Sequence, residues 1–90
     1  MTRDSRPCLA ARARLRFDRR SGRHLLLYPE RGLLLTETAA EIVGLLDGQR
    51  TVAAIVDALV AAYGDGARAA IERDVVAFLD ALAARALLRC

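Results

Sequence analysis

The stretch YPERGLLLTETAAEIVGLLDG, residues 28–48, decides the fold of this 90-residue chain. It joins a turn, a short apolar strand, a helix cap, an amphipathic helix and a helix stop, with no spare residues between them. A second helix is predicted to follow directly, capped by Thr51. A sheet edge set against helices in so small a chain favours a module that holds another polypeptide over one that carries out chemistry.

Two further strands are predicted before the third one, and the second of them ends at the first residue of the quoted stretch. Residues 14–18 alternate apolar and charged side chains, which is the period of a half-buried strand. A turn at residues 20–23 leads to an apolar strand over residues 25–28, and the proline that follows ends this strand because it has no amide hydrogen to donate. Residues 31–32 are expected to complete a second turn before the third strand, residues 33–35. Two tight turns in succession predict a three-stranded antiparallel meander.

Three helices are predicted after the strands. Either Thr36 or Thr38 can cap the first, because Thr36 allows a fuller first turn and Thr38 forms a capping box with Glu41. The second is expected over residues 51–64 and the third over about residues 67–84. Each helix carries an apolar stripe that should enter the core. The stripes are Ala39, Ile42, Val43 and Leu46; then Val52, Ile55, Val56, Leu59, Val60 and Tyr63; then Ile71, Val75, Phe78, Leu79 and Leu82.

The expected fold is α+β, a three-stranded antiparallel sheet followed by three helices in a winged-helix-like arrangement. Residues 14–90 are predicted to form one domain, with an apolar tail at residues 87–88 closing over the core. Residues 1–13 are expected to form a flexible basic N-terminal arm. Residues 1–31 hold nine arginines and three acidic residues, whereas residues 32–90 hold five arginines and eight acidic residues. A basic first third therefore precedes a slightly acidic helical body.

No catalytic, cofactor or metal site is predicted. His24 is the only histidine, and the sequence suggests no nucleophile or orienting partner for it. Cys8 and Cys90 lack metal-ligand spacing and are expected to be thiols, with a terminal disulfide only if the two ends meet. The chain shows no apolar run of bilayer length and no signal-peptide pattern. These observations favour a cytoplasmic protein that is not an enzyme.

A winged-helix DNA-binding protein is the alternative interpretation. The second and third helices are joined closely enough for a helix-turn-helix, with the sheet as its wing. A recognition helix should expose an excess of basic residues. The third helix instead balances its three arginines with Glu72, Asp74 and Asp80. DNA binding is therefore the weaker hypothesis.

The third strand is predicted to leave one edge of the sheet open. In a sequential meander, residues 33–35 pair on one side only, and no charge or proline blunts the other side. Val76 and Ala83 lie beside the core stripe of the third helix and would extend an apolar groove wall next to this edge. An extended peptide can add there as a fourth strand. There are two alternatives. The same edge, or the arm, can form a homodimer, or the small side chains of the alanine-rich helix have no binding role.

The order of these segments resembles the PqqD family. YPE is followed by TA..I..LLDG, TV..IV..L and DV..FL..L, and the similarity covers about residues 14–88. The resemblance implies a three-stranded sheet followed by three helices, and a non-catalytic peptide chaperone of pyrroloquinoline quinone (PQQ) biosynthesis. It also implies a recognition element for ribosomally made, modified precursor peptides. One departure is Arg31, which makes the turn before the third strand one residue longer than the family pattern.

The resemblance also implies partners and site residues. The precursor peptide PqqA would add as a strand antiparallel to the third strand and be presented to the radical SAM enzyme PqqE. Peptide-binding residues would be Leu33, Leu34 and Leu35, through their main-chain groups, and Val76, Leu79 and Ala83, as the groove lining. Residues 28–30 would shape the turn before the strand. No cofactor is implied.

Overall fold

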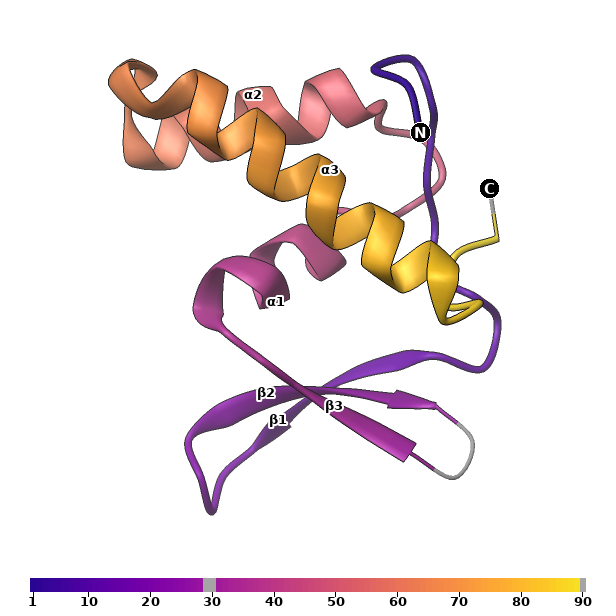
Figure 1. Ribbon diagram of the computed structural model, residues 1–90. Helices are drawn as coiled ribbons and strands as arrows, with labels where there is room; N and C mark the ends of the chain where they lie inside the picture. The colour runs from indigo at the N-terminus through magenta and orange to yellow at the C-terminus, as the bar shows by residue number, and fades with distance from the viewer. Residues whose placement is uncertain (29–30, 90) are drawn as a thin grey trace.

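A small antiparallel sheet forms one layer of the molecule, and three helices lie on one side of it, with α2 farthest from the sheet (Figure 1). The computed structural model describes residues 1–28 and 31–89. Strands β1 (Arg14–Asp18), β2 (Arg23–Tyr28) and β3 (Arg31–Leu35) lie in that order, and both pairs are antiparallel. The predicted meander is therefore confirmed, with β1 at its predicted bounds.

The start of β3 differs from the prediction. Arg31 and Gly32, expected in a turn, pair with Tyr28 and Leu27 as the first residues of the strand. A Cβ at position 32 would lie 3.3 Å from Leu27 Cδ2, so the end of that exposed side chain would have to shift slightly to admit a larger residue. The turn residues predicted at positions 29–30 lie outside the described residues.

The three predicted helices are present, and side-chain caps begin the first two. Their bounds are α1 (Glu37–Gly44), α2 (Val52–Tyr63) and α3 (Arg68–Ala84), with a short 3-10 turn, η1 (Asp65–Ala67), before α3. Of the two candidate caps for α1, Thr36 is the one used, since its hydroxyl accepts a hydrogen bond from Ala39 N at 3.1 Å. Thr51 caps α2 in the same way, accepting from Ala54 N at 3.1 Å.

The core forms where the helical stripes meet the inner face of the sheet. Leu26 at the centre of β2 and Leu79 on α3 are fully buried, and Leu87 after α3 closes over them as predicted. The predicted core residues of α1 and α2 are buried or pack against the core, with one exception. Tyr63, at the end of α2, is 52% exposed, and its hydroxyl donates to Glu41 Oε1 at 2.8 Å.

The N-terminal arm lies in contact with the body of the domain. Pro7 and Cys8 are buried, and isolated β-bridges join Cys8 to Asp47 and Leu9 to Leu88. Backbone hydrogen bonds hold the arm along its length, including one from Gly48 N to Pro7 O at 3.1 Å. The structure thus places the arm against the turn after α1 and the segment after α3, rather than as a loosely held extension.

Candidate functional site

A groove with a volume of about 340 Å³ separates β3 from α3. Its walls are mainly apolar and come from elements far apart in the sequence. On the strand side they are Leu33, Leu34 and Leu35, with Thr36 and Ala39 beyond them, and on the helix side they are Phe78, Ala81, Leu82 and Arg85. The groove therefore lies beside the strand that the sequence predicted to form an open edge.

Strand β3 is an edge strand whose side chains alternate between two environments. It pairs with β2 on one side, and in the described part of the chain no strand pairs with its other side. Leu35 is 6% exposed and belongs to the core, and Leu33 is half-buried against it. Leu34 points to the opposite face and is 51% exposed. The edge thus offers main-chain groups and an apolar side chain together.

The helix wall of the groove differs from the prediction. Leu79 is fully buried in the core, Val76 is half-buried and packs against the core, and Ala83 is exposed. None of the three is among the residues that line this groove, and their part in peptide binding stays a prediction. Phe78 and Ala81 line it instead.

Helical geometry explains the difference. The core stripe of α3 has two flanks, with Val76 and Ala83 on one and Phe78, Ala81 and Arg85 on the other. Both flanks contain apolar residues, so the sequence does not show which one faces β3. The spacing of Phe78, Ala81 and Arg85 at i, i+3 and i+7 was the available signal for the second flank.

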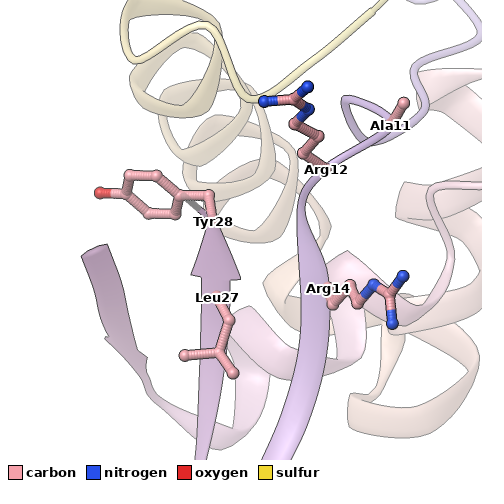
Figure 2. Close-up of a pocket in the computed structure, with 5 residues that line it drawn as sticks. All are labelled: Ala11, Arg12, Arg14, Leu27 and Tyr28. Atoms are coloured by element: carbon pink, nitrogen blue, oxygen red, sulfur yellow. The ribbon is translucent and has the colours of Figure 1, made fainter. Parts of the chain in front are cut away.

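Charged side chains stand at the two ends of the groove. A hollow of about 250 Å³ adjoins the end marked by Phe78, and Asp74 lines it. A hollow of about 290 Å³ adjoins the other end, and its lining includes Arg12, Tyr28 and Arg85. Figure 2 shows the Arg12 side chain extending from the chain before β1 toward the segment after α3, and Tyr28 at the end of β2 with its ring pointing away from Arg12.

The surroundings of His24 and of the potential metal ligands can be described directly. His24 packs edge-to-face on Phe17, its partner across β1 and β2, with ring centroids 5.0 Å apart. The described ranges, 1–28 and 31–89, contain no group of three or more His, Cys, Asp or Glu side chains placed to hold a metal ion. In the same ranges, no helix is long and apolar enough to cross a membrane. Cys90, one of the two predicted thiols, lies outside the described residues.

Comparison of the sequence with known families and proteins gives one consistent result. The family model for coenzyme PQQ synthesis protein D (PqqD) matches residues 23–88. A PqqA binding protein from Rhodopseudomonas palustris strain TIE-1 is 51% identical over 84 residues, which cover 93% of this chain and 81% of that protein. A PqqA binding protein from Xanthomonas axonopodis pv. citri strain 306 is 42% identical over 89 residues, covering 99% and 96%.

Two solved structures share the fold. One is the solution NMR structure of the PqqD truncation of Methylobacterium extorquens PqqCD, which is 38% identical, with a TM-score of 0.79. That truncation is described as a functional, stand-alone recognition element for ribosomally synthesized and post-translationally modified peptides. The match covers 93% of this chain and 88% of that one. The crystal structure of PqqD from Xanthomonas campestris is 35% identical, with a TM-score of 0.62 and coverage of 100% and 99%. The comparisons give the DNA-binding alternative no support.

Proposed function

The chain belongs to the PqqD family, and from that membership we propose that it binds the precursor peptide PqqA as an added strand beside β3. The observation that carries the proposal is the apolar groove between β3 and α3, which lies next to an edge strand without a partner on that side in the described residues. A peptide in this position would take main-chain hydrogen bonds from β3 and place alternate side chains against Phe78 and Ala81.

The protein would act as a chaperone or adaptor without catalysis. We propose that it presents the bound PqqA to the radical SAM enzyme PqqE in the cytoplasm and uses no cofactor of its own. Strand addition suits this role because it holds the paired segment of a peptide extended and leaves the flanking segments accessible. A second copy of this chain is the competing occupant of the same edge, and the mass of the protein in solution with and without peptide distinguishes the two.

Two arginine substitutions on α3 test the site. Ala81 and Ala83 are both exposed, but only Ala81 lines the groove. We expect Ala81→Arg to weaken binding of R. palustris PqqA at least about tenfold, which is about 1.4 kcal/mol, because the long charged side chain fills the groove. Ala83→Arg is the matched control and should bind within about twofold of the wild type. Titration calorimetry gives both affinities.

The same pair of variants tests presentation. If PqqA reaches PqqE through the groove, Ala81→Arg should also lower the yield of the Glu–Tyr cross-link that PqqE makes in the peptide, while Ala83→Arg should not. Wild-type affinity in a folded Ala81→Arg variant would contradict the groove as the peptide site. Val76→Arg is less suitable, since Val76 packs against the core and an arginine there would also disturb the fold.

A further inference from the structure

The strongest unexplained feature of the surface is the positive charge where the groove ends near the start of β3. Arg85 lines both the groove and the second hollow, so the two adjoin at this residue. Arg12, from the chain before β1, lines the same hollow. Tyr28 also contributes to the hollow, and its partner across the sheet is Arg31.

Neither arginine that lines this hollow pairs with an acidic side chain among residues 1–28 and 31–89. In the part of the chain that the structure describes, the side chains of Arg12 and Arg85 form no ion pair or hydrogen bond, whereas Arg3, Arg50 and Arg68 each pair with an acidic residue. Two guanidinium groups beside one hollow attract an anion, and a carboxylate fits their planar donors.

The opposite end of the groove carries the opposite charge. The hollow that adjoins Phe78 is lined by Asp74, whose side chain has no ion-pair partner among the described residues. The groove is therefore negative near the end of β3 and positive near its start. A peptide that runs antiparallel to β3 would enter at Asp74 and leave at Arg85.

We propose that Arg12 and Arg85 form a subsite for an acidic side chain of the bound peptide, just C-terminal to the residues that pair with β3. This inference rests on the proposed function, since it takes the groove as the peptide site. It gives the expected antiparallel direction an electrostatic reason, because an acidic side chain at the C-terminal end of the paired segment would meet Arg85 in that orientation and Asp74 in the opposite one. The ligand class is a peptide with Asp or Glu at that position.

The first measurement compares arginine variants. Fluorescence anisotropy of labelled R. palustris PqqA at low salt gives its affinity for the wild type, Arg12→Gln, Arg85→Gln and the double variant. We expect about fivefold weaker binding for the double variant, the upper range for an exposed ion pair. Arg73→Gln is the matched control, because Arg73 is exposed on α3 and does not line the groove or its two hollows. It should bind within about twofold of the wild type.

The second measurement finds the acidic residue. Each Asp or Glu of the peptide is replaced in turn by its amide, and each peptide is titrated against the wild type and the double variant. One substitution should weaken wild-type binding about fivefold and leave the double variant unaffected. Hydrogen exchange of the bound peptide shows whether that residue follows the protected segment.

The outcomes separate the two proposals. If wild-type protein binds the peptide and the double variant binds it equally well, the subsite is wrong and the groove is unaffected. If the coupled acidic residue precedes the protected segment, the arginines do bind it, but the antiparallel direction and the position of the subsite C-terminal to the paired residues are wrong. If the wild type does not bind the peptide at all, the proposed function fails and the subsite fails with it.

Discussion

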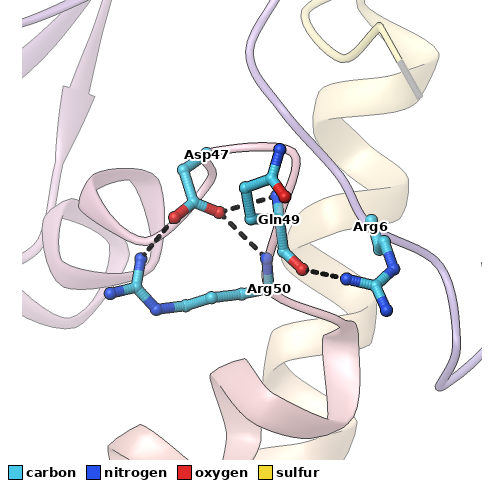
Figure 3. Close-up of polar contacts among 4 residues, drawn as sticks. All are labelled: Arg6, Asp47, Gln49 and Arg50. Carbon is cyan, nitrogen blue, oxygen red and sulfur yellow. Dashed lines mark hydrogen bonds and ion pairs between the residues drawn. The ribbon is translucent and has the colours of Figure 1, made fainter.

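At the scale of single residues, Asp47 organises the turn between α1 and α2. Its carboxylate accepts hydrogen bonds from the backbone N–H groups of Gln49, at 2.9 Å, and Arg50, at 3.0 Å, and from the Arg50 guanidinium at 2.8 Å (Figure 3). Arg6 of the arm donates to the Gln49 carbonyl in the same turn. The backbone N–H of Arg50, followed by that of Gln49, holds the pKa of Asp47 below its usual value.

This lowered pKa predicts how Asp47→Asn changes stability with pH. A carboxylate whose pKa is lower in the folded state contributes stability that is present above the unfolded value, 3.8, and is lost as pH falls through the folded value. We expect Asp47→Asn to have a lower urea midpoint than the wild type at pH 7, and the difference to narrow as pH falls below the unfolded value. Asp57→Asn, which removes an exposed ion pair with Arg68, is the control and should change the midpoint little. A difference that does not depend on pH would contradict the role given to the carboxylate.

At the scale of elements, the arm completes the start of α2. The first two N–H groups of the helix donate to the carbonyl oxygens of Ser5 and Arg3, at 2.9 and 3.0 Å. The third, from Ala54, donates to the Thr51 hydroxyl. The N–H groups of a first turn have no partner inside the helix, so these acceptors satisfy groups that would otherwise need water. A side chain and a distant segment thus cap one helix together.

Loss of the side-chain cap should have a measurable cost. Thr51→Ala is expected to lower the free energy of unfolding by about 1 kcal/mol, because Ala54 N loses its acceptor. Thr51→Ser keeps a hydroxyl at the same place and should retain most of the stability. Urea unfolding followed by circular dichroism measures both variants. Equal losses in the two would show that the methyl group, rather than the cap, provides the stabilisation.

At the scale of the whole molecule, the two ends of the described chain are joined. Leu9 forms a bridge with Leu88, Ala10 N donates to Leu87 O at 2.7 Å, and Arg89 N donates to Cys8 O at 2.9 Å. The arm therefore runs from the start of α2 to the segment that follows α3 (Figure 1). These contacts hold the segment after α3 beside Arg12, at the end of the groove.

Deletion of residues 1–9 tests this arrangement. The deletion removes buried Pro7 and Cys8 together with the acceptors for α2, so we expect a loss of at least about 1 kcal/mol and a fall in Tm of about 4–8 °C. Arg3→Gln is the control, because it removes only an exposed ion pair with Glu72 and should change Tm little. Calorimetry gives Tm, and light scattering gives the mass. An unchanged Tm, or a dimer that becomes a monomer on deletion, would contradict an arm that packs within its own chain.

The sequence by itself determined the elements and their order. β1 has its predicted bounds, Thr51 caps α2 as predicted, and α3 begins within one residue of its predicted start. These features depend on neighbours in the chain, namely period-2 alternation, the i, i+3, i+4 stripe and a hydroxyl three residues before an N–H group. The strand side of the groove was predictable for the same reason, since a sequential meander exposes the edge of its last strand.

Only the tertiary structure decided which flank of α3 faces β3 and where the arm lies. The apolar stripe around Leu79 fixes α3 against the core, but both flanks of the stripe contain apolar side chains. Which flank faces β3 therefore depends on how α3 crosses the sheet. The acceptors that the arm supplies to α2 lie more than 40 residues from their donors, beyond any local pattern. Local hydrogen bonding and periodicity are written in the sequence, whereas the relative placement of distant segments follows from packing the whole core.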